Sequence, residues 1–295
     1  MPSVYEVITN RIIEQLESGV APWHKPWKER GRAGLPRNLV TDREYRGINV
    51  WMLLASGFES PYWLTFRQAA SLGGQVRAGE HGLPVVYWKF GKREVQDGEE
   101  IIDKWMVLCR YYTVFNLEQC DGIKAPGRSQ EPQPEINPIE ACEQIVNGWS
   151  LKPEIRPGGD RAGYDKLHDI VRIPDLEAFD NAEEYYSTLF HELTHSTGHP
   201  SRLNRSTLMD SEFFADENYT REELVAEMGA AFLCGLAGIE NKTINNSVSY
   251  LRSWLSALKD DCRLVLIAAG QAQKAVDCIQ AALEQGTLPQ NAAVE

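Results

Sequence analysis

Apolar residues recur at intervals of three and four along several stretches of this chain, which is the spacing of an amphipathic helix. In the first half the pattern predicts helices over residues 5–17, 49–55 and 66–72. Residues 85–90 and 105–115 are instead rich in β-branched and aromatic side chains, which favours strands. The polar segment 91–100 lies between them, so we expect a hairpin with a long loop.

Longer helical patterns follow in the second half. We expect helices over residues 139–149, 182–195, 219–234, 245–259 and 261–283, with Asn181 as the N-cap of the second. Segments 154–156 and 170–173 flank a Gly158-Gly159-Asp160 turn, which predicts a second hairpin. An edge strand beside a helix can hold an extended peptide by main-chain hydrogen bonds. Because helices and strands occur in both halves, the predicted fold class is α+β.

A proline-rich segment separates the two halves. Residues 124–138 contain four prolines and almost nothing apolar, which is typical of an extended linker. A chain of 295 residues is long enough for two domains. We therefore predict one domain over residues 1–124, a linker over 125–137 and a second domain over 138–295.

Composition narrows the class of protein. No apolar run approaches 18 residues, so we expect no membrane span. The first residues have neither a basic stretch nor an apolar core, so we expect no secretory signal. None of the six cysteines forms a C-x-x-C pair. A reduced, cytoplasmic protein is the simplest interpretation.

The net charge of −12 is unevenly distributed. Residues 1–128 carry 17 basic and 15 acidic side chains, whereas residues 129–295 carry 13 and 27. Such a contrast indicates different partners for the two halves.

The most specific chemical motif is His191-Glu192-Leu193-Thr194-His195, an H-E-x-x-H sequence within the helix predicted over 182–195. Residues four apart lie on one helix face, so both imidazoles can bind one Zn²⁺. Glu192 stands beside the metal, placed to take a proton from a water on it. This pattern indicates metal-assisted hydrolysis, most often of a peptide bond. The alternative is two surface histidines on an amphipathic helix.

A third protein ligand is needed at such a site. The metzincin extension fails, because Gly198 fits but Ser201 stands where a histidine is required. The helix predicted over 219–234 carries Glu223 and Glu227, four apart and able to face one site. Glu222 is expected to point elsewhere, into solvent.

The combination resembles a gluzincin-type protease. The resemblance implies that Glu223 is the third ligand and that Glu227 orients a ligand histidine. The reverse assignment stays open, because spacing alone does not order two carboxylates on one face. A purely structural role for the pair, in capping or salt bridges, is the other alternative.

Aromatic and basic residues are mixed in the first half. Six of the eight tryptophans precede residue 110, at positions 23, 27, 51, 63, 88 and 105. Lysines and arginines lie among them, including Lys25, Lys28, Arg30, Arg32 and Arg43. This mixture suits single-stranded nucleic acid, because cations follow the phosphates and aromatic rings stack on bases. For any one tryptophan, a place in the core is the more common outcome.

Nearly the whole chain resembles the ArdC-type antirestriction proteins. The likeness is carried by residues 17–27, 37–38, 45–51, 62–69, 74–82, 191–195, 202–203 and 222–227. It implies a single-stranded DNA-binding domain, also similar to one in some plasmid primases, followed by a zincin-like metallopeptidase domain. It further implies a plasmid-borne protein that protects incoming DNA from host restriction, with DNA-associated host proteins such as restriction enzymes as partners. Our candidates for DNA contact are Arg37, Asn38, Tyr45, Arg46, Asn49, Arg67, Gln68 and Arg77.

These predictions combine into one hypothesis with a rival. In the first, His191, His195 and Glu223 hold Zn²⁺, or Mn²⁺ or another divalent ion, and Glu192 is the general base. In the rival, the protein protects DNA by binding alone and the metal is structural or regulatory. A nuclease is disfavoured, because nuclease sites usually gather carboxylates around two metals.

Overall fold

The computed structural model describes residues 3–18, 35–97, 100–125, 137–210, 217–239 and 248–284. Contacts divide it into two compact units: residues 1–10 with 33–128, and residues 11–32 with 129–295. Both contain helices and strands, which confirms the α+β class and the two-domain organisation. The domain limits at residues 124 and 138 stay predictions, because residues 126–136 lie outside the described ranges.

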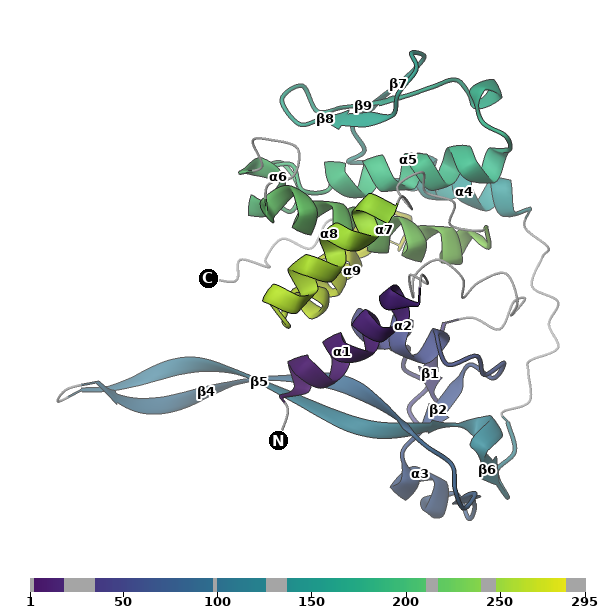
Figure 1. The fold of residues 1–295 in the computed structure, drawn as a ribbon, viewed down its shortest axis with the longest axis vertical. Helices are drawn as coiled ribbons and strands as arrows, with labels where there is room; N and C mark the ends of the chain where they lie inside the picture. The colour runs from purple at the N-terminus through teal and green to yellow at the C-terminus, as the bar shows by residue number, and fades with distance from the viewer. Residues whose placement is uncertain are drawn as a thin grey trace. The chain divides into compact units, whose positions relative to one another are not determined.

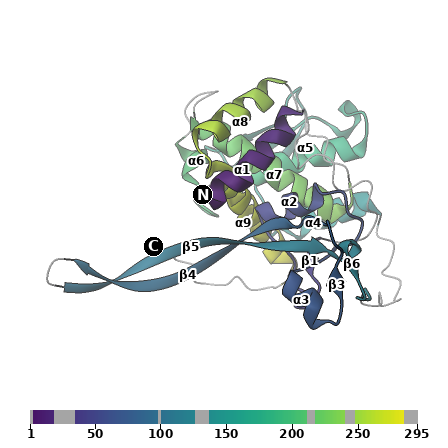
Figure 2. The same ribbon diagram turned by 60° about the horizontal axis from the view of Figure 1, so that its bottom comes forward.

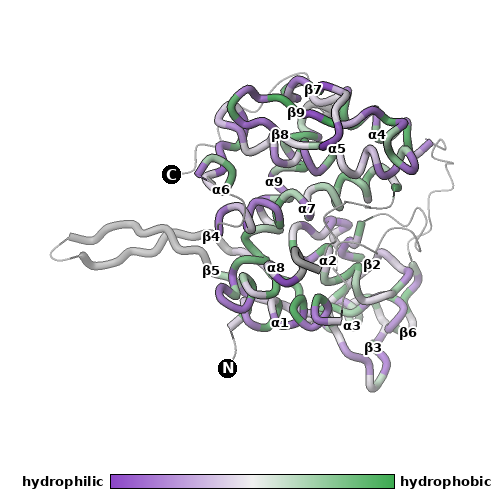
Figure 3. The backbone as a smooth tube through the Cα atoms, turned by 45° about the horizontal axis from the view of Figure 1, so that its top comes forward, coloured by the Kyte–Doolittle hydropathy of each residue, from purple (hydrophilic) through white to green (hydrophobic). Residues whose placement is uncertain are grey.

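The first helix, α1 (Val4–Glu17), is amphipathic as its sequence predicts. Ile8, Ile12 and Leu16 lie four apart on one face and are buried. Figure 3 shows green hydrophobic positions alternating with purple hydrophilic ones along this helix. Trp23 and Trp27 lie outside the described residues, as do Lys25, Lys28, Arg30 and Arg32.

A four-stranded sheet organises the first unit, in the order β1-β2-β5-β4. Its strands are β1 (Arg37–Asn38), β2 (Tyr62–Leu64), β4 (Leu83–Asp97) and β5 (Glu100–Asn116). Strands β1 and β2 are parallel, and the other neighbours are antiparallel. The remaining elements are α2 (Ile48–Leu54), α3 (Phe66–Ser71), β3 (Gln75–Val76), β6 (Cys120–Asp121) and the 3-10 helix η1 (Leu117–Gln119).

The long loop predicted over residues 91–100 is wrong. Strand pairing continues from Leu83 opposite Val114 to Asp97 opposite Glu100, so only residues 98–99 separate the strands. Polarity misleads here because an antiparallel ladder is held by backbone hydrogen bonds and accepts polar side chains wherever a face meets water. Figures 1 and 2 both show β4 and β5 as a two-stranded ribbon that extends well beyond β1 and β2.

Tryptophans fill the core of the first unit. Trp63 is fully buried with Leu53, Val85 and Val114. Trp51 is also inaccessible to solvent. These two rings therefore cannot stack on a nucleic acid, which is the outcome that burial statistics favour for tryptophan.

The second unit consists of helices and a small sheet. Its helices are α4 (Pro138–Gly148), α5 (Ala182–Ser196), α6 (Ser206–Met209), α7 (Glu217–Ala237), α8 (Val248–Asp260) and α9 (Leu264–Glu284). Its strands are β7 (Glu154–Pro157), β8 (Gly163–Asp165) and β9 (Ile170–Ile173), and the 3-10 helix η2 (Leu176–Ala178) follows them. The sheet lies on one side of α5, and α7 packs on another side with α9 beyond it (Figure 1).

The predicted hairpin between residues 154–156 and 170–173 is wrong. Strand β7 pairs with β9 in parallel, and β8 pairs with β9 on its other edge in antiparallel fashion. The short strand β8 has only three residues, too few to show a period of two in the sequence. The sheet order is β7-β9-β8, so β8 is an edge strand. Strand β8 also contacts α5.

Helix α7 is buried on all sides over most of its length. Every residue from Glu222 to Cys234 is buried. A helix that is apolar all round is typical of a protein interior. The three glutamates that it carries are therefore taken out of water as well, which makes partners for each of them obligatory.

Candidate metal centre

Two histidines lie on the inner face of α5. Asn181 caps the helix by accepting a hydrogen bond from the backbone N–H of Glu184, as the sequence predicts. The four-residue spacing then brings the Nε2 atoms of His191 and His195 within 3.1 Å of each other. The two residues are only 4% and 8% exposed, so both rings are aimed into the protein.

Glu223 of α7 completes the cluster. Its Oε2 lies 3.6 Å from His191 Nε2, and its Oε1 lies 3.5 Å from His195 Nε2. Two atoms bound to one tetrahedral ion at about 2.1 Å lie about 3.4 Å apart. The three separations agree with that value, so the residues fit a divalent metal ion held by two imidazoles and one carboxylate.

Each histidine also has a carboxylate at its other nitrogen. Glu227 Oε1 lies 3.8 Å from His191 Nδ1, and Glu222 Oε1 lies 3.3 Å from His195 Nδ1. Such partners fix the orientation and tautomer of a metal-binding imidazole. The arrangement favours Glu223 as the ligand and Glu227 behind it, as the gluzincin resemblance implies.

The expectation that Glu222 faces solvent is wrong. It is 2% exposed, and Arg205 and Thr207 donate hydrogen bonds to its carboxylate. The reason is that α7 packs on all of its faces, so no side of this turn reaches water. Spacing predicted one shared face for Glu223 and Glu227. The carboxylate of Glu222, the residue before Glu223, also reaches the histidine pair.

A glycine lets α7 approach α5 this closely. A Cβ added to Gly229 would lie 2.4 Å from Thr194 Cγ2 and 2.8 Å from Thr194 Oγ1. Thr194 itself is held in place because its hydroxyl donates to the carbonyl of Phe190 at 2.7 Å. Any larger residue at position 229 would push the glutamates of α7 away from the histidines of α5.

The carboxylates dominate the electrostatics of the cluster. Burial alone would lower the pKa of His195, but hydrogen bonds to Glu222 and Glu223 raise it to about 10. For Glu222 burial acts to raise the pKa, and its bonds to His195 and Arg205 outweigh it and lower the pKa to about 2. A metal ion that binds here must displace protons from the imidazoles.

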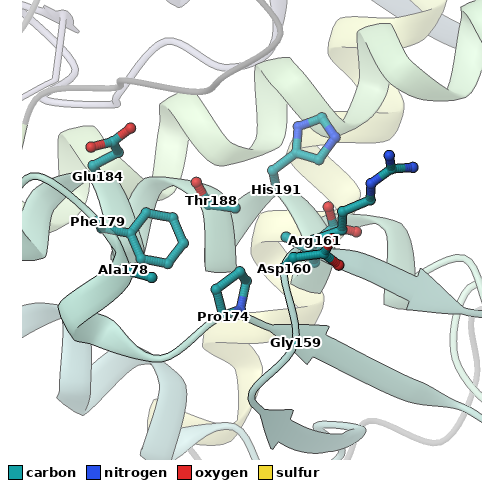
Figure 4. Close-up of a pocket in the computed structure, with 11 residues that line it drawn as sticks. Gly159, Asp160, Arg161, Pro174, Ala178, Phe179, Glu184, Thr188 and His191 are labelled. Atoms are coloured by element: carbon teal, nitrogen blue, oxygen red, sulfur yellow. The ribbon is translucent and has the colours of Figure 1, made fainter.

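A cavity of about 740 Å³ opens onto this cluster. His191 and Glu192 lie in its wall. Figure 4 shows Thr188 on α5, one turn before His191. The Thr188 hydroxyl is buried and has no hydrogen-bond partner among the described residues. Opposite α5 the cavity is lined by Gly159, Asp160, Arg161, Ala162, Pro174, Ala178 and Phe179, and Glu184 completes the lining. Its volume is within the range of small-ligand sites.

Two family models match the chain. The N-terminal domain of anti-restriction factor ArdC matches residues 2–115, and a zincin-like metallopeptidase matches residues 140–271. The metal-free crystal structure of the antirestriction ArdC protein from plasmid R388 is 38% identical, with a TM-score of 0.75 over 95% of this chain and 98% of that one. This chain belongs to the ArdC-type antirestriction family.

Two further comparisons are consistent with this. The Mn(II)-bound structure of the R388 protein is 37% identical, with a TM-score of 0.75 over 97% of this chain and all of that one. An uncharacterised Sinorhizobium fredii protein, y4eC, is 34% identical over 94% of this chain and 92% of its own length. The zincin-like domain of the family implies a divalent metal, and the cluster described above fits one.

A DNA primase, TraC of Escherichia coli, is 38% identical over 94% of this chain. The match covers 27% of that protein, and a second TraC is covered over 20% of its length. The chain thus spans about a quarter of the primases that it matches.

Most of the predicted DNA contacts have partners inside the ArdC-type first unit. Arg37 pairs with Asp42 and Glu44, and Arg77 pairs with Glu80 and Asp121. Both amide atoms of Asn49 bond the backbone of Val86 on β4, at 2.7 and 2.8 Å. The side chains of Asn38 and Gln68 bond each other at 3.2 Å, and Tyr45 packs against the Trp63 core. Arg46 and Arg67 are exposed.

Several residues around the metal site carried no sequence signal. Arg205 and Thr207 lie in a stretch without periodicity, and only the fold brings them to Glu222. For Arg161 the available sequence signal is its position in the loop that follows Gly158 and Gly159. His168 and His199 prove to be local: His168 faces Asp165 at 2.9 Å and His199 faces Ser201 at 2.7 Å.

Proposed function

We propose that this ArdC-type chain is a divalent-metal-dependent peptidase carried to DNA by its first unit, and that it protects incoming DNA from host restriction. The observation that supports the peptidase most strongly is the position of Glu192. Glu192 is partly exposed in the wall of the cavity, and the adjacent residue His191 lies in the same wall. His191 is one of the three residues that fit a metal ion.

His191, His195 and Glu223 would hold the ion, with Zn²⁺ the default for two histidines and a glutamate and Mn²⁺ also suited. When bound, a divalent ion polarises the scissile carbonyl and the attacking water. Glu192 takes a proton from that water and returns it to the leaving amine. Glu227 and Glu222 keep the two imidazoles in the orientation that the ion requires.

An extended peptide is the class of substrate that suits the cavity. One wall is α5 with Thr188, and the facing wall is the chain between β7 and β8, including Arg161. Strand β8 is an edge strand, so it can add the substrate as a further strand. Such a peptide would give the buried Thr188 hydroxyl the partner that it lacks in the described part of the chain.

Binding of single-stranded DNA by the first unit would explain how a general peptidase finds its substrates. Tethering raises the local concentration of the active site around proteins on the same DNA, such as restriction enzymes. Arg46, Arg67 and Arg77 are the exposed cations among our candidates for DNA contact, and Arg77 is paired with Glu80 and Asp121. Because phosphate contacts release counterions, the affinity of the full chain for single-stranded DNA should fall steeply as salt rises. Absence of binding at low salt would refute this part.

A second function is favoured by the position of the ligands. His191 and His195 belong to α5 and Glu223 belongs to α7, so a metal ion would cross-link two central helices of the second unit. In that case the ion stabilises the fold, and protection comes from DNA binding alone.

Mixing the Mn²⁺-loaded full-length chain with a restriction endonuclease and its unmodified target DNA separates the two functions. A peptidase should convert the endonuclease into fragments on a denaturing gel, and an excess of chelator added beforehand should prevent this. An endonuclease that stays intact with the metal-loaded chain would contradict the peptidase and support the binding function.

A further inference from the structure

The ribbon of the first unit carries an exposed aromatic pair. Tyr87 on β4 is 54% exposed and Tyr112 on β5 is 48% exposed. Their ring centroids lie 6.3 Å apart at an interplanar angle of 66°. Because the rings meet edge to face, at least one face of each is left open by the other.

Strand register places a cation on the same face. Tyr87 lies directly opposite Arg110, and Tyr112 lies opposite Val85. Since side chains two apart share a face, Tyr87, Arg110 and Tyr112 all point to the face on which Val85 and Val114 enter the core. On this face the buried side chains of Val85 and Val114 are therefore followed, along the strands, by two exposed rings and an exposed guanidinium.

Charge on this part of the ribbon has one sign. Residues 83–88 and 109–114 contain no acidic residue, and Arg110 is their one charged side chain. Within the described part of the chain no acidic group forms an ion pair with Arg110. Two arginines of the predicted contact set contrast with it, because Arg37 and Arg77 are each neutralised by two carboxylates.

Core packing does not account for this arrangement. Tyrosines that contribute to a core are buried, and these two are about half exposed. Open rings next to an unneutralised cation are instead what single-stranded nucleic acid binds, because bases stack on the rings and a phosphate meets the guanidinium. In a duplex the bases are already stacked on each other, so their faces are not available to stack on the tyrosine rings.

We propose that Tyr87, Tyr112 and Arg110 form the base-stacking surface for single-stranded DNA in the first unit. The proposal rests on the DNA binding proposed above and places it on the ribbon rather than on the polar network of Arg37, Asn38 and Asn49. That network holds the fold together, whereas the two rings and the guanidinium of Arg110 on the ribbon face are exposed.

The chain provides a matched control. Tyr111 is 49% exposed, lies next to Tyr112 on the same strand and pairs with Val86, so its ring points to the opposite face. Its replacement by alanine removes as much exposed ring as the change at Tyr112 does, from the wrong side of the ribbon.

Binding of the full-length chain to a fluorescent oligothymidylate of about 20 nucleotides tests the proposal. Tyr87→Ala and Tyr112→Ala should each weaken binding about tenfold, whereas Tyr87→Phe and Tyr111→Ala should bind as wild type does. Arg110→Ala should weaken binding and reduce the slope of log affinity against log salt by about 0.7. Affinity for a duplex of the same length should not change in the two tyrosine variants.

Equal losses for Tyr111→Ala and Tyr112→Ala would overturn the proposal, as would wild-type affinity in Tyr87→Ala and Tyr112→Ala or an equal loss on duplex DNA. In each of those cases DNA binding by the wild type still stands. Wild-type protein that fails to bind the oligonucleotide at low salt would instead refute the proposed DNA binding itself.

Discussion

Arg205 donates two hydrogen bonds to the carboxylate of Glu222, from Nη2 to Oε1 at 2.6 Å and from Nε to Oε2 at 3.1 Å. The same guanidinium bonds Thr197 Oγ1 and the carbonyl of Thr194, so it joins the end of α5 to α7. The pair keeps a charged carboxylate beside His195 in a region from which water is excluded. An orienting carboxylate is thereby itself held in place.

Removal of this carboxylate should affect both stability and metal binding. Glu222→Ala leaves the buried Arg205 without its counter-charge, which should cost about 3–5 kcal/mol in the free energy of unfolding. Loss of the partner of His195 should weaken metal affinity about 10- to 100-fold. Chemical denaturation and metal titration measure the two effects. As a control, Glu217→Ala removes an exposed partner of Arg221 on the same helix and should cost less than about 1 kcal/mol. Unchanged metal affinity in Glu222→Ala would show that Glu222 does not orient His195.

The contact between Gly229 and Thr194 should not tolerate a methyl group. Gly229→Ala should destabilise the protein by about 1–3 kcal/mol and weaken metal binding, because α7 must move away from α5. Gly270 lies within α9 with nothing within 4 Å of its Cβ position. Gly270→Ala should therefore be neutral or stabilise by up to about 1 kcal/mol, through helix propensity. Thermal unfolding of the two variants compares them, and equal effects would contradict the close approach at Gly229.

Thr188 should matter for ligand binding and not for folding. Thr188→Val replaces a buried hydroxyl that has no partner in the described ranges with a methyl group of similar shape, so stability should be unchanged or higher by about 1 kcal/mol. Affinity of the Mn²⁺-loaded chain for a peptide hydroxamate should fall, because the hydroxyl is expected to bond the peptide main chain. A destabilised variant with unchanged hydroxamate affinity would mean that the hydroxyl serves the fold.

Acid should weaken the tie between Asp169 and Arg202. Burial acts to raise the pKa of Asp169, but hydrogen bonds from Arg202 and Tyr164 outweigh it and hold the pKa below its usual value. Its contribution to stability is therefore full above the unfolded pKa of about 3.9 and is lost as pH falls through the lower folded value.

Asp169→Asn should accordingly cost about 2 kcal/mol at pH 7, and the difference from wild type should shrink as pH falls below about 4. Asparagine suits the left-handed backbone at this position, where φ is 55°. Asp42 has a φ of 54° and a largely exposed carboxylate that pairs with Arg37, so Asp42→Asn is the control for the same change at an exposed pair and should cost less than about 1 kcal/mol. Urea unfolding between pH 3 and 7 makes the comparison, and a constant difference for Asp169→Asn would contradict the assigned pKa.

Local patterns predicted the metal-site helices well. The spacing of His191 and His195, the cap at Asn181 and the shared face of Glu223 and Glu227 are all properties of single helices, which a sequence contains directly. The buried role of Glu222 is not such a property. It depends on which helices surround α7, and that is decided by contacts between distant segments.

Strand partners were harder to predict for the same reason. The parallel pairing of β7 with β9 joins residues 154 and 170 around a three-residue strand that has no detectable period. The DNA-contact candidates show a related limit. A polar residue such as Asn49 or Gln68 looks the same in a sequence whether it contacts a ligand or bonds the backbone of a strand or helix. Only its partner in the fold distinguishes these two roles.

Antirestriction by Glu192→Gln tests the central claim most directly. Glu192 is not among the atoms that fit the metal ion, so the variant should keep wild-type metal content and wild-type affinity for single-stranded DNA. With both confirmed, transfer of unmodified plasmid DNA into a restricting host measures protection. We predict that protection is lost, because the proton transfers that peptide hydrolysis needs are lost with the carboxylate. Protection at the wild-type level would contradict a peptidase mechanism and leave DNA binding as the protective activity.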